Sequence, residues 1–219
     1  MSTDLDQLWP LLFPAIGQTL RMVAAVMLIV IAVGTPVGVV LHNSSPGALF
    51  PHRALRATLS WVVNLGRSLP FLILMAAIIP FTRYVAGTTI GVSAAIVPMS
   101  LAGIPYFARL VETALREIPR EATEAGRAAG GSRLQVIVSV QLAEALPALA
   151  GSLTIAIVGM LEFSAIAGTI GAGGIGYLAI SYGYERFDTT VMTATIVTLI
   201  VMVQVIQFTG DRVVRRLSH

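Results

Sequence analysis

Long apolar runs without charge alternate along this chain with short polar segments that carry arginine. A helix of about 20 apolar residues is long enough to cross the roughly 30 Å hydrocarbon core of a bilayer. The pattern therefore predicts an all-α, polytopic membrane protein: one transmembrane domain over residues 1–219 with about five transmembrane helices. The predicted spans cover, approximately, residues 16–41, 59–82, 88–109, 142–165 and 189–210.

The apolar runs contain breaks. The second span, 59–82, is interrupted by Arg67 and Pro70. The connection 168–188 is rich in glycine and tyrosine, and we expect it to lie on the periplasmic or external side. Three residues near the far end of the first span predict a kink or a close helix packing there: Gly34, Pro36 and Gly38.

Composition supports a membrane protein and excludes some chemistry. Hydrophobic residues make up 56% and charged residues 11%, whereas a soluble domain carries about 25% charged residues. The net charge of +3 comes from arginine alone. Without lysine the chain lacks the P-loop residue that holds nucleotide phosphates, so we do not expect it to hydrolyse ATP by that route. The sequence has no cysteine, which excludes disulfides and thiolate metal sites.

Arginine placement predicts the orientation of the spans, because cytoplasmic loops carry an excess of positive charge. Five spans put the termini on opposite sides. If the polar segment between the third and fourth spans is cytoplasmic, so are the first loop and the arginine-rich C-terminus. The opposite side then holds only Arg21, Arg83 and Arg186. We expect the N-terminus outside, the C-terminus in the cytoplasm and, since Met1–Gln7 has no early positive charge, no cleavable signal peptide.

The segment 117–133 is polar although it lies between two apolar runs, so it must lie in water. Its many alanines and glycines would let the backbone of another protein come close. Glu124 and Arg127 stand three apart and share one face of a helical turn. These features predict a short amphipathic helix that docks into a groove of a partner. The alternative is an ordinary solvated loop.

The same segment resembles the EAA loop of the permease subunits of ATP-binding-cassette (ABC) importers. Glu124-Ala125-Gly126 followed by Gly130 fits the pattern, with Gly126 in place of the usual third alanine, and Glu144-Ala145-Leu146-Pro147 fits its downstream part. Further stretches are similar to the methionine-type permeases: Arg67-Ser68-Leu69-Pro70-Phe71, Ile79-Pro80-Phe81-Thr82-Arg83, Ile170-Gly171-Ala172-Gly173-Gly174, Tyr182-Gly183-Tyr184 and Gln207-Phe208-Thr209-Gly210-Asp211-Arg212.

This resemblance implies the transmembrane subunit of an ATP-driven importer in the plasma (inner) membrane. Its pathway would carry a small amino acid, most specifically methionine as the D or L form. The implied partners are a second copy of the chain, a dimer of ATPase subunits, an extracytoplasmic substrate-binding protein and the lipid bilayer, with no nucleic acid. The chain would hold no cofactor, since ATP and Mg would bind to the ATPase. The implied coupling residues are Glu121, Glu124, Ala125, Gly126, Arg127 and Gly130.

Three residues at and just after the end of the fourth span are candidates for the transport pathway. Glu162 follows about 17 uncharged residues, and a carboxylate inside a span is costly unless it faces water or a partner. The methionine-type permeases usually have a small residue there. Ile166, in the segment with Ser164, falls where these permeases have an apolar residue at the narrowest point of the pathway, and such a ring can block solutes by dewetting. Simple packing is the alternative for Ile166.

Other signals have competing explanations. Arg67 is a pathway candidate as an intramembrane charge, although it could also extend to the headgroups. Gly171–Gly176 matches G-x-G-x-x-G, but a dinucleotide site requires a βαβ unit; a flexible or tightly turned re-entrant segment fits better. His42, His52 and His219 do not form a metal signature. The competing functions are a secondary carrier or channel without an ATPase, and a membrane scaffold without a pathway.

Overall fold

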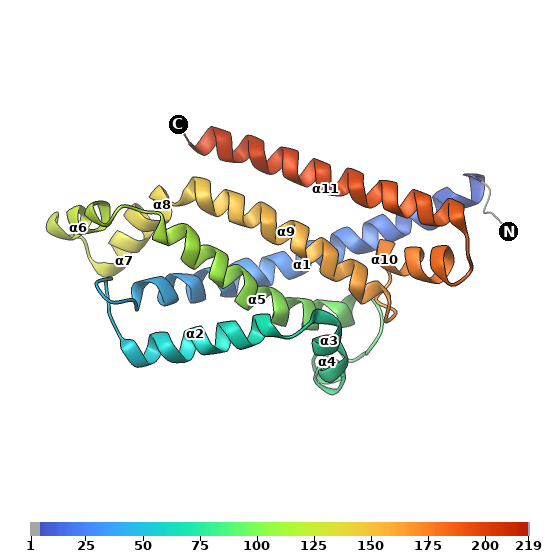
Figure 1. The fold of residues 1–219 in the computed structure, drawn as a ribbon, viewed down its shortest axis with the longest axis horizontal. Helices are drawn as coiled ribbons and strands as arrows, with labels where there is room; N and C mark the ends of the chain where they lie inside the picture. Colours follow the sequence, from blue (N-terminus) through green and yellow to red (C-terminus); the bar gives the residue numbers. More distant parts are fainter. Residues whose placement is uncertain (1–4, 219) are drawn as a thin grey trace. The chain divides into compact units, whose positions relative to one another are not determined.

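The structure, a computed structural model, describes residues 5–218, and within that range the chain forms helices and turns without a strand. The all-α prediction is confirmed. The elements, of which Figure 1 labels the α-helices, follow in chain order: α1 Leu5–Asn43, α2 Arg53–Ser68, α3 Phe71–Ala77, α4 Ile79–Ala86, α5 Val92–Arg116, α6 Arg120–Ala128, α7 Arg133–Val136, the π-helix η1 Ile137–Gln141, α8 Leu142–Glu144, α9 Leu146–Gly168, α10 Gly174–Leu178, the π-helix η2 Ala179–Tyr184, and α11 Thr189–Leu217.

Four of the described helices, α1, α5, α9 and α11, are long and apolar enough to cross a membrane. The second predicted span, 59–82, is not one continuous helix. It is divided among α2, α3 and α4, and the axes of α2 and α3 differ by 98°. Pro70 explains the break, because proline lacks the backbone N–H and disfavours helical geometry at Leu69 before it. Counting this bent pair as one span gives five.

Contacts between residues divide the chain into two compact units, and each long helix contributes to both. Unit 1 comprises residues 1–29, 69–103 and 157–207, of which 1–4 lie outside the described residues. Unit 2 comprises residues 30–68, 104–156 and 208–219, described as far as residue 218.

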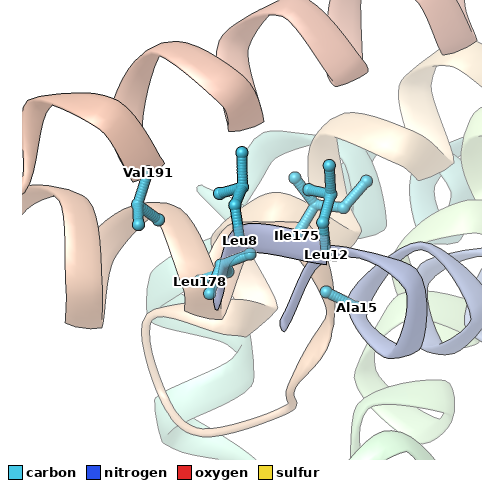
Figure 2. Close-up of a cluster of buried hydrophobic side chains, with 6 residues drawn as sticks. All are labelled: Leu8, Leu12, Ala15, Ile175, Leu178 and Val191. Atoms are coloured by element: carbon cyan, nitrogen blue, oxygen red, sulfur yellow. The ribbon is translucent and has the colours of Figure 1, made fainter. Parts of the chain in front are cut away.

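Unit 1 has an apolar cluster where α1, α10 and α11 meet. Figure 2 shows the six buried side chains that form it: Leu8, Leu12, Ala15, Ile175, Leu178 and Val191. The start of α11 is fixed by Asp188, whose Oδ1 accepts hydrogen bonds from the backbone N–H groups of Thr190 at 3.0 Å and Val191 at 3.2 Å. Such a side-chain cap satisfies donors that the first turn of a helix leaves free.

The glycine-rich connection after α9 is a close-packed turn into a short helix. A Cβ atom on Gly176 would lie 2.2 Å from the carbonyl oxygen of Ala165, so only glycine fits this crossing of α9 and α10. At the start of α10, the backbone N–H of Gly174 donates to Gln18 Oε1 at 2.7 Å, and that of Ile175 donates to Thr19 Oγ1 at 3.0 Å. The G-x-G-x-x-G pattern therefore serves helix packing, and most of the predicted loop 168–188 is helical.

Unit 2 contains a close approach between α1 and α5. A Cβ atom on Gly38 would lie 2.6 Å from the carbonyl oxygen of Ala108, and one on Gly34 would lie 3.1 Å from the ring of Phe107. Two small residues four apart let helix backbones come together, as in the small-xxx-small motifs of membrane helices. The close packing predicted at Gly34 and Gly38 is confirmed.

We predict that Gly176→Ala lowers the midpoint of thermal unfolding by about 4 °C or more, because the added methyl group forces the backbones of α9 and α10 apart. Gly17→Ala is the matched control in the same unit, since a Cβ atom there meets nothing within 4 Å. Melting of the two detergent-purified variants checks the prediction, and equal midpoints would contradict it.

Candidate functional site

The polar segment between α5 and α9 folds as the helix α6, and none of its residues is buried. It follows Pro119, whose ring favours the extended conformation at that position, and it carries Glu121 in its first turn and Arg127 in its last. Both charges complement the helix dipole. The predicted amphipathic helix is thus present at residues 120–128, and the solvated-loop alternative is wrong.

Two glycines end α6 in a Schellman motif. The N–H of Gly130 donates to the carbonyl of Arg127 at 3.0 Å, and the N–H of Gly131 donates to that of Gly126 at 3.2 Å. Gly130 has φ +84°, a left-handed conformation that favours glycine, and a Cβ atom on Gly131 would lie 2.8 Å from the carbonyl oxygen of Gly126. Gly130 therefore has a structural role at the end of the helix, whatever it contributes to coupling.

The chain then turns back into α7 through a capping box. The N–H of Gln135 donates to Ser132 Oγ at 3.3 Å, and the N–H of Ser132 donates to Gln135 Oε1 at 2.8 Å. Gly126 packs against Val136 and Val140 from the other side of this turn. Together these contacts hold α6 against α7 and η1.

The side chains of α6 point in two directions. Glu124 and Arg127, predicted to share a face, both line a cavity of about 450 Å³ inside unit 2. Glu121 and Ala125 are exposed and do not line that cavity. Glu121 and Ala125 therefore lie on a different face of α6 from the two cavity-lining residues.

The cavity is basic. Its walls come from the turn after α1, the first turn of α2, the end of α5, and α6, and we call it the basic cavity. The charged and histidine side chains that line it are His42, Arg56, Arg116, Arg120, Glu124 and Arg127.

A buried carboxylate joins the elements around the basic cavity. Glu112 on α5 is fully buried, and its two oxygens accept hydrogen bonds from Arg109 and Arg116. The guanidinium of Arg56 on α2 lies 4.0 Å from the carboxylate. Arg109 also donates to Asn64 Oδ1 on α2 at 2.7 Å, so the cluster ties α2 to α5. A buried charge is tolerated only when it is paired and hydrogen-bonded in this way.

A second polar contact joins the end of α1 to η1. Asn43 Nδ2 donates to Gln141 Oε1 at 2.8 Å, and Gln141 Nε2 donates to Asn43 Oδ1 at 3.0 Å. Both side chains are buried, so each amide satisfies the other where water does not reach. This reciprocal pair fixes η1, and with it the base of the α6–α7 turn.

The pathway candidates lie on α9 in unit 1. Glu162 is exposed and forms no ion pair within residues 5–218, and Ile166, one turn later, is half-buried. Ser164 is buried, and its hydroxyl donates to the carbonyl of Leu161 at 2.7 Å; its role in the pathway stays a prediction. The ring of Phe163 stacks on that of Phe71 at 4.5 Å.

The remaining candidates have local structural explanations. Arg67 is exposed in the last turn of α2, where a positive charge complements the helix dipole. His52 Nδ1 accepts a hydrogen bond from the N–H of Leu55 at 3.1 Å and so caps the start of α2. His219 lies outside the described residues.

The sequence analysis missed Glu112 and the Asn43–Gln141 pair. Glu112 had a usable signal, because arginines three residues before it and four after it lie on its own helix face. No local pattern could have found the amide pair, whose members are 98 residues apart.

The fold and this site define a class: a multi-pass helical membrane protein with a polar helix outside its apolar spans. The chain belongs to the family of binding-protein-dependent transport system inner membrane components, whose model matches residues 34–219. The probable D-methionine transport system permease protein MetI of Vibrio cholerae is 49% identical over 95% of this chain and 93% of its own length. The protein of the same name from Pasteurella multocida is 37% identical over 97% of this chain and 98% of its own length.

Solved structures agree with this assignment. A chain of the MetNI methionine ABC transporter in an inward-facing conformation has a TM-score of 0.96 and 41% identity, covering 99% of this chain and 100% of that one. A chain of an amino acid ABC transporter crystallised with histidines has a TM-score of 0.79 and 18% identity, covering 99% of this chain and 100% of that one. This is a likeness of fold alone.

We predict that Glu112→Gln destabilises the protein by about 2 kcal/mol, because the variant leaves three clustered arginines without their carboxylate. The control is Glu117→Gln, the same change at an exposed position just beyond α5. Urea titration of both purified variants measures the difference, and a Glu112→Gln protein as stable as the control would contradict the role assigned to this cluster.

Proposed function

We propose that the chain forms the transmembrane pathway of an ATP-driven importer for methionine, as the D or L form. The observation that carries the proposal is α6, a helix closed at its C-terminal end by a Schellman motif yet with no buried residue. Such a helix fits a docking role. The substrate is supported by the names of the relatives and of the solved transporter, which concern D-methionine and methionine.

In this proposal the working protein is a dimer of this chain bound to two ATPase subunits. The outward face of α6, with Glu121 and Ala125, docks into a groove of each ATPase, where ATP and Mg bind. Closure of the ATPase dimer on ATP moves α6, and the movement passes into the spans as a rigid-body rotation. The Schellman motif and the capping box support this mechanism, because they make the α6–α7 turn stiff enough to transmit a displacement.

The proposed orientation places the N-terminus outside, α6 and the C-terminus in the cytoplasm, and an extracytoplasmic binding protein at the outer mouth. The division into units supports it. All arginines except Arg21, Arg83 and Arg186 fall in unit 2, together with α6. A strong arginine excess is typical of the cytoplasmic side.

Within the pathway, we assign Glu162 and Ile166 to the face of α9 that meets the second copy. They are four residues apart and so lie on one side of the helix. Two Ile166 side chains at a two-fold axis would form an apolar constriction that closes by dewetting. An exposed carboxylate one turn away gives the same face a polar group that can line a hydrated vestibule.

Co-purification and uptake test the function together. The tagged chain, expressed with its neighbouring transport subunits and solubilised in mild detergent, should carry an ATPase with it, and cells should accumulate labelled methionine only while ATP is available. Ala125→Leu places a bulkier, helix-compatible side chain on the outward face of α6. It should reduce both ATPase recovery and uptake at least tenfold.

Ala32→Leu, the same change at an exposed position in the apolar part of α1, is the control and should leave both measurements unchanged. Normal recovery of the ATPase with Ala125→Leu would refute docking through this face. Methionine uptake without any ATPase would instead favour the secondary carrier.

Transport measurements in proteoliposomes test the assignment of Ile166 and Glu162 to the pathway. Ile166→Ala should let methionine cross proteoliposomes without ATP, because two methyl-sized side chains leave a hydrated gap, and Glu162→Gln should lower ATP-driven uptake several-fold. Ile155→Ala, at an exposed position on the same helix, is the control for loss of apolar volume. Tight Ile166→Ala vesicles, or full activity of Glu162→Gln, would remove the corresponding residue from the pathway.

A further inference from the structure

The basic cavity carries more positive charge than its own residues neutralise. Arg56 and Arg116 share the carboxylate of Glu112, which Arg109 also binds. Arg120 and Arg127 form no ion pair with any residue that the structure describes, and Glu124 is the one acid that lines the cavity. The guanidinium groups of Arg120 and Arg127, together with the net positive charge of the arginines around Glu112, favour the binding of an anion.

The volume is too large for a small ion alone. About 450 Å³ falls in the range of pockets that hold whole organic ligands. A second hollow of about 490 Å³ shares Pro46 and Arg56 with the basic cavity and continues along the outside of α2. We call it the α2 groove; its other lining residues are Arg53, Ala57, Ser60, Trp61 and Asn64.

Trp61 indicates the depth of these two hollows in the membrane. Its side chain is 64% exposed, and exposed tryptophans of membrane proteins concentrate at the boundary between hydrocarbon and headgroups. Arg56 precedes it by five residues on the same helix, a rise of about 7.5 Å. The arginine wall of the basic cavity thus lies at the depth of lipid phosphates, while the α2 groove reaches toward the acyl chains.

We propose that the basic cavity binds the phosphate headgroup of an anionic phospholipid whose acyl chains lie in the α2 groove. Guanidinium groups bind phosphate oxygens through paired, charge-assisted hydrogen bonds. Basic pockets between membrane helices on the cytoplasmic side are suited to such headgroups. A zwitterionic lipid binds less well because its ammonium group faces the same arginines. This site is separate from the transport pathway and does not depend on the identity of the substrate.

Quenching of Trp61 fluorescence by brominated acyl chains tests the proposal directly. The chain has two tryptophans, so Trp9→Phe leaves Trp61 as the reporter. The full-length protein is reconstituted in phosphatidylcholine vesicles that contain a small, equal fraction of brominated phosphatidylglycerol or brominated phosphatidylcholine. The ratio of the two quenching efficiencies gives the preference of the Trp61 site for the anionic lipid.

We expect a preference of about fivefold or more in the Trp9→Phe background, since each arginine near the surface contributes about this factor for an anionic headgroup. Adding Arg120→Gln should reduce the preference about fivefold, and Arg120→Lys should retain most of it. Arg133→Gln is the matched control: the same charge is lost from an exposed arginine that does not line either hollow. It should keep the full preference.

Two results would overturn the proposal. The first is equal quenching by the two brominated lipids, and the second is equal loss of preference with Arg120→Gln and Arg133→Gln, which would reduce the effect to net charge. Circular dichroism of each variant separates these results from misfolding.

Discussion

Helices surrounded by lipid gain nothing by moving apolar side chains from lipid to protein, so their association depends on close backbone approach and on polar bonds. This constraint accounts for the packing within each unit. In unit 2 the absence of a side chain at Gly38 lets α1 reach the backbone of α5, and in unit 1 Gly176 does the same for α9 and α10. Burial within the chain differs among the long helices: 56% of the most apolar window of α5 is buried, against 11% of that of α11.

The polar bonds explain how a helix without buried residues keeps its place. A helix as short as α6 is marginal in water by itself. Its stability comes in part from its C-terminal end, where the Gly130–Gly131 turn satisfies carbonyl groups that the helix leaves free, and the capping box at Ser132 then starts α7. This turn packs against η1, which the Asn43–Gln141 pair fixes to α1, while Glu112 fixes α2 to α5. The position of α6 therefore depends on hydrogen bonds between residues that lie outside this helix.

The sequence predicted the features that depend on the pattern of residue types along the chain. The apolar runs located the long helices, the polar segment 117–133 located α6, and Gly34 with Gly38 indicated a close crossing. Three-dimensional pairing was harder to predict. Pro70 was recognised as an interruption, yet the size of the bend follows from tertiary packing. Gly130 was assigned to coupling because a motif contains it, although its backbone conformation already requires glycine. The basic cavity was missed because its arginines come from three separate elements.

The π-helix η1 has a mechanical consequence for the route from α6 to α9. A π turn holds one residue more than an α turn, and such insertions are common at functional sites. If the extra residue moves along the helix by a turn, the backbone keeps its hydrogen bonding while the residues that it passes rotate about the helix axis by about 100°, one residue of a 3.6-residue turn. The connection at Ile137–Gln141 can therefore reorient one turn of side chains without unfolding the span that follows.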